Sequence, residues 1–410
     1  MRAWVRRALW LTCAPVMLVA QPVDGVPAPN ADVVLLTMGQ GDAVWERFGH
    51  NALIVPREGD GTPLAYNWGM FDFAQPNFLG RFLTGDTKYW MEPFSVPETL
   101  EAYGRGNRAV IAQRLALAPT QRDALARALA TNALEANRYY RYDYYRDNCS
   151  TRARDAIDAL TGGAVRRQLQ AMPGTGSYRW HTRRIMQDDL PLYFGAQLVL
   201  GVDADAPLTA WDEAFLPTAL AASLRRVELP AGDGLPARML VAREDTLVRA
   251  VREAEPTRVP SKLPVAMLVG AGVAGALVLL GRGAKGAAAM VATWALVCAL
   301  LGTILLLAWF ATRHVYMANN PSVALVHTGW LLAIGAAIAC WRGRVTHGWR
   351  TLMRTLLGIA VVGTAGAALA GHAGSALEMA ALFLPGHAAV TWLVDREAAR
   401  RRAVGGALAR

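Results

Sequence analysis

Cysteine and histidine are scarce in this chain, whose 410 residues include four cysteines and seven histidines. Between residues 21 and 262, Cys149 is the only cysteine, and His50 and His181 are the only histidines. A single cysteine cannot form a disulfide within that stretch, and the histidines and cysteine show no metal-binding spacing. We therefore expect no disulfide, no metal and no other cofactor in this part.

Charged residues are scarce in the segment 263–394, where Ala, Leu, Val and Gly dominate. Runs of about 20 apolar residues are long enough to cross the roughly 30 Å hydrocarbon core of a bilayer. The residues before this segment resemble an ordinary globular stretch, long enough for one domain with a core. The sequence predicts an all-α membrane domain with five transmembrane helices at 263–281, 287–311, 321–340, 352–371 and 376–394.

The basic residues of the membrane part are concentrated in alternate loops. Arg and Lys occur in loops 282–286 and 341–350 and in the tail 395–410, whereas Arg313 is alone in the other two loops. The positive-inside rule places the basic loops and the C-terminus in the cytoplasm, and residues 21–262 on the opposite side. The net charge of +10 therefore requires no nucleic-acid partner.

The first 20 residues have the pattern of an export signal. A basic start that contains Arg2, Arg6 and Arg7 precedes the apolar run ALWLTCAPVMLVA. This pattern fits a signal peptide or an uncleaved signal anchor, and it agrees with the charge rule. We expect a membrane protein with four parts: residues 1–20, an exported domain at 21–262, the membrane domain at 263–394 and the basic tail at 395–410.

Strand and helix patterns are mixed in residues 21–262. Short apolar or alternating stretches predict strands at 32–38, 50–55, 63–73, 87–94 and 108–117. Amphipathic stretches predict helices at 118–134, 149–163, 191–201 and 217–227, and the tyrosine-rich link 138–147 is expected to be extended. We expect an α+β domain with an antiparallel sheet.

Cys149 is the first candidate for chemistry, in the sequence RDNCSTR. A lone cysteine is usually a small core residue. Here its flanks are polar, and it begins a predicted helix that Asn148 or Asp147 could cap. A helix N-terminus lowers the pKa of a thiol and favours the nucleophilic thiolate.

A thiol nucleophile needs a base, and His50 is the better of the two histidines. It follows Gly49 and begins an apolar strand, whereas His181 lies among basic residues. Asn67 is the candidate for orienting the imidazole, and Asp72 is the runner-up. The alternative interpretation is a structural histidine and ordinary turn or strand-capping chemistry.

Several segments together resemble the Lnb-type lipoprotein N-acyltransferase family: ERFGHNALIV, YNWGMFDF, PNFLGRFLTGDTKYWM, NRYYRYDYYRDNCSTRARDAID and WDEAFLP, with a weaker likeness in the loop RHVYMANNP. The resemblance implies a protein of the bacterial inner membrane, in which residues 21–262 form a periplasmic domain before the membrane segments. It also implies that His50 and Cys149 are the reactive groups. Histidine before cysteine is also the order of circularly permuted papain-like enzymes similar to lecithin:retinol acyltransferase.

The resemblance implies transfer of an acyl chain from a lipid ester, through a Cys149 thioester, to the N-terminal amine of a diacylglyceryl-cysteine lipoprotein. The donor is either a phospholipid or the lipoprotein's own glyceryl ester. The expected partners are therefore diacylglyceryl lipoproteins and membrane lipids. The residues expected to bind substrate or to line the lipid access are Tyr142, Asp147, Asn148, Arg152, Asp72, His314, Asn320 and His372, with Glu378 as a further intramembrane candidate.

Two other functions remain open from the sequence. The same Cys149–His50 pair would suit a periplasmic thiol peptidase or amidase that acts on peptidoglycan. The chain could also be a non-enzymatic envelope lipid-binding protein or a transporter. Five predicted helices favour a lipid substrate over peptidoglycan, and the few charges within them disfavour an ion-coupled transporter.

Overall fold

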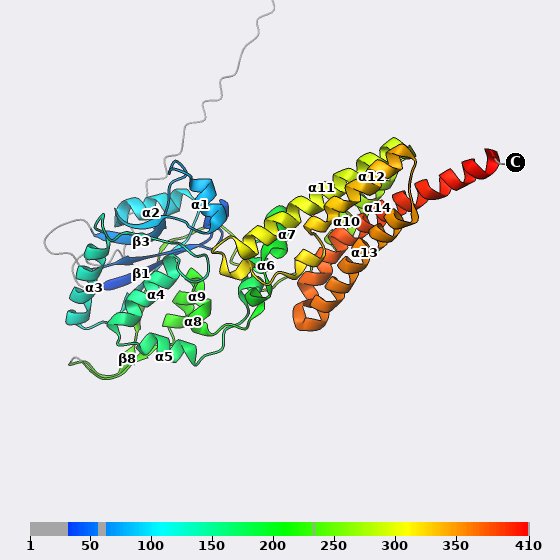
Figure 1. Ribbon diagram of the computed structural model, residues 1–410. Coiled ribbons are helices and arrows are strands. Elements are labelled where there is room, and N and C mark those ends of the chain that lie inside the picture. The colour runs from blue at the N-terminus through cyan, green and yellow to red at the C-terminus, as the bar shows by residue number, and fades with distance from the viewer. Residues whose placement is uncertain (1–31, 56–62, 233, 409–410) are drawn as a thin grey trace, which may run out of the picture.

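The computed structural model describes residues 32–55, 63–232 and 234–408. The chain forms an α+β part followed by a bundle of long helices (Figure 1). The expected signal segment, residues 1–20, lies outside the described residues.

The α+β part is built on a seven-stranded antiparallel sheet with the order β6-β4-β3-β2-β1-β5-β9. The five strands expected from the sequence are confirmed. The last strand, β9, was not anticipated, and the expected extended link 138–147 contributes only the short β6. The strands are β1 Val33–Met38, β2 His50–Ile54, β3 Leu64–Met70, β4 Tyr89–Ser95, β5 Val110–Leu115, β6 Tyr139–Tyr140 and β9 Val241–Val248, and a separate pair is β7 Glu228–Leu229 and β8 Arg238–Met239.

Helices cover both faces of the sheet. Val33 and Leu35 of β1 pack in the same core cluster as residues of α3 (Pro119–Asn132) and α4 (Cys149–Leu160). Their neighbours Val34 and Leu36 point to the other face, where α2 (Val96–Arg105) packs. Because side chains alternate along a strand, both faces of β1 are covered, and all six of its residues are buried.

Shorter helices complete this part of the chain. The expected helices at 118–134, 149–163, 191–201 and 217–227 are confirmed as α3, α4, α7 and α9, with shorter bounds. The remaining helices of the α+β part are α1 Phe78–Thr84, α5 Ala164–Gln170, α6 Tyr178–Ile185, α7 Leu190–Val199, α8 Ala210–Glu213 and α9 Pro217–Leu224.

Five stretches of the described chain are long and apolar enough to span a membrane. Four are continuous or nearly continuous helices: α10 Leu263–Leu280, α11 Gly283–Phe310, α13 His347–Ala367 and α14 Ala373–Leu408. The third stretch, Val315–Arg342, confirms the span expected at 321–340, but it is not one continuous α-helix. This stretch consists of the short turns η3 (Val315–Met317), η4 (Pro321–Ala324) and η5 (Thr328–Leu332), followed by α12 (Ala333–Arg342).

Local chemistry explains the broken third span. Asn320 caps η4 by accepting a hydrogen bond from the Ser322 N–H (2.9 Å), and Pro321 has no N–H to continue a helix. At the other end of the bundle, α14 continues as helix through the expected basic tail to Leu408.

The two parts share a packed junction. Phe194, Leu198 and Val199 of α7 pack against the core cluster of the helical bundle. Glu378 of α14 is buried, and it accepts hydrogen bonds from Arg183 Nη2 (2.7 Å) and the Tyr193 hydroxyl (2.9 Å). The boundary expected at residue 262 therefore separates two parts that are in tight contact, and α7 packs with the membrane helices.

Candidate functional site

Cys149 is the first residue of α4 and is 7% exposed. Asn148 caps the helix: its Oδ1 accepts hydrogen bonds from the N–H groups of Ser150 and Thr151, each at 2.9 Å. Its amide nitrogen donates to the Phe215 carbonyl (2.9 Å), which fixes the capping side chain. The thiol is therefore held at a rigid helix start.

His50 is the first residue of β2, and the preceding glycine determines the turn that leads into the strand. Gly49 has φ +80°, and a Cβ at this position would lie 2.7 Å from the carbonyl oxygen of Met38. Only glycine adopts this backbone conformation without strain. Glycine at this position therefore permits the close approach of the backbone to Met38.

Asn67 of β3 is the hydrogen-bonding partner of the His50 imidazole. The distance from His50 Nε2 to Asn67 Oδ1 is 3.0 Å, and Asn67 Nδ2 donates to the Ala65 carbonyl (2.8 Å). Because the amide nitrogen is already committed to a carbonyl, its oxygen must accept from the imidazole. His50 therefore carries its proton on Nε2, and Nδ1 has a free lone pair.

A β-bulge brings the cysteine close to the sheet. The pairing of β3 with β4 shifts register between Trp68 and Met70, and the intervening Gly69 has φ +90°. A Cβ on Gly69 would lie 3.8 Å from the Cys149 Cβ. Bulges commonly reposition side chains next to functional sites.

The thiol and the imidazole are both neutral at rest. Burial raises the pKa of Cys149 to about 11, although backbone N–H groups, that of Asn51 first, act in the opposite direction. Burial lowers the pKa of His50 to about 4, against the hydrogen bond to Asn67 and with a contribution from the Arg108 charge. The expectation that the helix start gives Cys149 a lowered pKa is wrong, because desolvation outweighs the helix terminus.

Two residues that the sequence analysis did not identify flank the histidine. The ring of Tyr103 stacks on His50, with ring centroids 6.4 Å apart and 12° between the planes. The guanidinium group of the buried Arg108 lies over the Tyr103 ring, 4.5 Å from its centroid. Arg108 also forms an ion pair with Glu46 (3.0 Å). The result is a fixed positive charge behind the imidazole.

His50 and Cys149 both line one cavity of about 520 Å³. Its walls are largely aromatic and aliphatic, and residues of the loop after α11 complete them. Such a space suits a flexible apolar ligand. The wall includes Trp45, Phe48, Trp68, Phe71, Phe78, Phe82, Tyr89, Tyr142, Tyr144 and Phe215 from the α+β part, Ala196 and Val199 from α7, and His314, Val315, Tyr316 and Met317 from the loop.

Three of the residues expected around the substrate line this cavity together with Cys149 and His50. Tyr142 stacks on Tyr89 with centroids 4.4 Å apart. Asn148 lines the cavity but serves as the cap of α4. His314 stacks with the Tyr144 ring, with centroids 5.9 Å apart.

Other expected residues are placed elsewhere. Asp147 and Arg152 form a two-point ion pair with each other (2.6 and 2.8 Å) and face a separate groove. Asp72 is exposed and accepts a hydrogen bond from the Ala74 N–H (2.8 Å), so it is a turn residue and not a partner of His50. Asn320 is buried at the junction, where it donates to the Leu198 carbonyl (2.8 Å).

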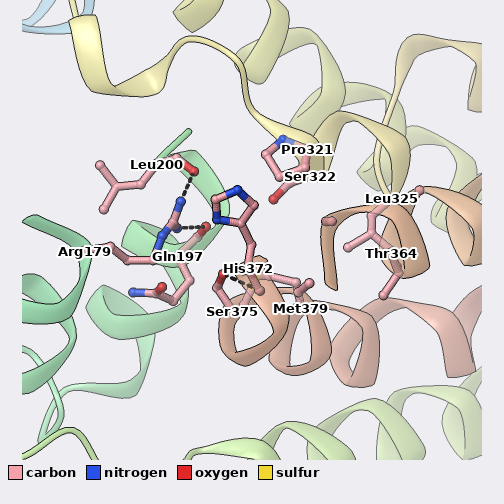
Figure 2. A pocket seen from close by; sticks show the side chains of 13 residues that line it. Arg179, Gln197, Leu200, Pro321, Ser322, Leu325, Thr364, His372, Ser375 and Met379 are labelled. Carbon is pink, nitrogen blue, oxygen red and sulfur yellow. Dashed lines mark hydrogen bonds between the residues drawn. The ribbon is translucent and has the colours of Figure 1, made fainter. Parts of the chain in front are cut away.

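His372 lines a different and much smaller pocket, shown in Figure 2. The pocket has a volume of about 20 Å³, which leaves room for about one water molecule. His372 Nδ1 lies 2.7 Å from Asp205 Oδ2, and Arg179 also pairs with Asp205 (2.8 Å). His372 therefore belongs to the junction between the two parts and not to the cavity of Cys149.

His181, the less favoured histidine, has structural partners. It lies 2.6 Å from Glu213 through Nε2, and Arg184 Nε donates to its Nδ1 (3.0 Å). With both ring nitrogens occupied in a buried site, it has no free atom for catalysis.

Comparison with known families matches residues 23–187 to the Lnb N-terminal periplasmic domain. This range includes His50, Asn67 and Cys149. Five membrane-capable stretches follow the matched region in the C-terminal part of the chain. Comparison with the curated proteins gave no match, and comparison with the solved structures gave none.

Proposed function

We propose that the protein is a membrane-bound N-acyltransferase that moves an acyl chain from a lipid ester, through a Cys149 thioester, to the N-terminal amine of a diacylglyceryl-cysteine lipoprotein. The observation that carries the proposal is the position of the thiol. Cys149 shares an apolar cavity of about 520 Å³ with a histidine whose tautomer is fixed by Asn67, and residues next to a membrane helix complete the wall. Histidine before cysteine along the chain, with Asn67 on the imidazole, supports the proposal that this domain is related to permuted papain-like thiol enzymes.

The first half-reaction begins from the neutral pair. As the Cys149 sulfur attacks the ester carbonyl carbon, His50 Nδ1 takes the thiol proton. The tetrahedral intermediate collapses when the glyceryl oxygen leaves and receives that proton from His50. The products are a thioester on Cys149 and a lyso-lipid.

The second half-reaction returns the enzyme to its starting state. The free amine of the lipoprotein attacks the thioester carbonyl, and His50 accepts a proton from the amine. The thiolate of Cys149 leaves and takes the proton from His50, which gives an amide and a neutral thiol. Asn67 keeps the imidazole in the tautomer that both steps need.

Two backbone groups are the candidates for stabilising the oxyanion. Asn148 already occupies the N–H groups of Ser150 and Thr151. The N–H groups of Asn51 and Cys149, which both act on the sulfur, remain to donate to the developing charge.

The test uses full-length protein reconstituted with a synthetic diacylglyceryl-cysteine lipopeptide, with and without added phospholipid. We expect mass spectrometry to detect an acyl group on the Cys149 peptide, released by hydroxylamine, and an amide-linked acyl chain on the lipopeptide. Acyl transfer without phospholipid would identify the lipopeptide ester as donor. Cys149→Ser should abolish the thioester, whereas Cys298→Ala, a buried bundle cysteine, should retain transfer. Unchanged transfer in Cys149→Ala, or cleavage of peptidoglycan peptides instead, would refute the proposal.

A further inference from the structure

Four large apolar side chains are exposed at the edge of the cavity that they also line. Val44, Trp45, Phe73 and Leu79, here called the rim, have exposed fractions of 48%, 59%, 59% and 67%. They are contiguous, because Trp45 and Phe73 have ring centroids 5.4 Å apart, and Phe78, next to Leu79, lies 5.0 Å from Phe73. A contiguous exposed apolar patch marks an interaction surface.

The rim is held at the level where a membrane helix ends. Helix α11 ends at Phe310, and the following Arg313 donates its N–H to the Thr84 carbonyl at the end of α1 (2.9 Å). His314 Nε2–H donates to the Phe82 carbonyl (3.0 Å). Phe310 is itself 75% exposed, so an outward apolar surface runs from α11 toward α1. In Figure 1, α1 lies on the side of the α+β part that faces the bundle.

The opposite wall of the cavity is also close to the membrane part. Ala196 and Val199 of α7 line the cavity, and Val199 packs against the core of the bundle. The cavity is therefore lined both by a helix that packs on the bundle and by the exposed rim.

We infer that the rim inserts into the outer leaflet of the membrane that the bundle spans, so that the cavity receives acyl chains sideways from the bilayer. Tryptophan favours the interface between headgroups and hydrocarbon, because one end of its side chain is apolar and the other is polar. Phenylalanine and leucine are typical of the apolar face that interfacial segments bury in the membrane. The occupant of this surface is the lipid bilayer. The inference deepens the proposed function, because it concerns the same cavity, but its test requires no turnover.

The test places a photoreactive amino acid at matched positions of the full chain. Leu79 or Leu83 of α1, or Leu134 beyond α3, is replaced by p-benzoylphenylalanine. These leucines are 67%, 60% and 58% exposed, so the three probes differ in location and not in accessibility. Figure 1 shows α3 at the end of the domain away from the bundle. Each variant is reconstituted in vesicles of phosphatidylethanolamine and phosphatidylglycerol, checked for an unchanged melting temperature and irradiated.

We expect phospholipid adducts, identified by mass spectrometry, at positions 79 and 83 and at least tenfold fewer at position 134. Three results would each overturn the inference. They are equal lipid labelling at all three positions, the absence of lipid adducts from both position 79 and position 83, and crosslinking of position 79 to a second copy of the chain. Adducts in a Cys149→Ser background would support membrane insertion even if the acyl-transfer proposal had failed.

Discussion

Substitution of Asn67 by alanine tests whether the amide orients a catalytic imidazole. The change removes the acceptor of the His50 Nε2–H, which lies 3.0 Å from Asn67 Oδ1. Leaving a buried donor unpaired costs about 1–3 kcal/mol, and each 1.4 kcal/mol in a transition-state barrier is about tenfold in rate. If the imidazole must hold this tautomer in both half-reactions, kcat should fall by about 5- to 150-fold with little change in KM.

The assay is single-turnover acylation of Cys149 followed by mass spectrometry, with thermal unfolding measured in parallel. Gln113→Ala is the matched control, because Gln113 is a buried amide of the same sheet that bonds the Ala221 carbonyl (2.9 Å) away from the cavity. It should lose stability but acylate at the wild-type rate once folded. Equal rate losses in the two variants, or full activity of Asn67→Ala, would refute the orienting role.

Four further outcomes follow from the structure. Iodoacetamide should modify Cys149 at a rate that keeps rising above pH 9, because the pKa is raised to about 11, and a plateau below pH 9 would contradict burial of the thiol. The unfolded thiol ionises first, so this group should also reduce stability as pH rises from about 9 to 11; comparison with Cys149→Ala isolates the effect. Gly49→Ala should lower the free energy of unfolding by about 1–3 kcal/mol through backbone strain. Gly195→Ala is the control, because a Cβ at that position has open space and should not lower the stability. Equal melting temperatures of the two variants would refute this reasoning. Glu378→Leu should destabilise the junction by about 3–5 kcal/mol, because it removes the carboxylate that pairs with Arg183. Thermal unfolding in detergent measures this loss, and Glu378→Gln should lose less. A wild-type melting temperature for Glu378→Leu would contradict the prediction.

The sequence was most informative where the chemistry is local. Asn148 can cap α4 because cap and helix are adjacent in the chain, and Gly49 was recognisable from its place before an apolar strand. Scarcity helped as well, since few residues competed with His50 and Cys149 for the reactive roles. Asn67 was less certain from the sequence, because its partnership with His50 depends on the pairing of β2 with β3.

Long-range packing determined what the sequence did not reveal. Tyr103 lies in α2, and Arg108 lies just before β5. Both are far from His50 in the sequence, so no sequence spacing connects them to the site. The direction of the Cys149 pKa followed from desolvation, which depends on the whole fold and outweighed the helix terminus. Asp147 and Arg152 flank the cysteine in sequence, yet they pair with each other and face a different groove.

The composition of the cavity bears on which reaction a thioester at Cys149 would undergo. A thioester can react with water or with an amine, so a transferase must limit water while it admits the amine. His314, Val315, Tyr316 and Met317, from the loop after α11, form part of the cavity wall. A single helix would be enough to anchor the domain in the membrane. The cavity wall, in contrast, requires the loop after α11 to stay at a fixed distance from α1. The hydrogen bonds of Arg313 and His314 to carbonyl groups of α1 hold the loop there. Under the proposed function, the residues that the loop after α11 adds to the largely apolar wall limit water around a Cys149 thioester, and this favours aminolysis over hydrolysis.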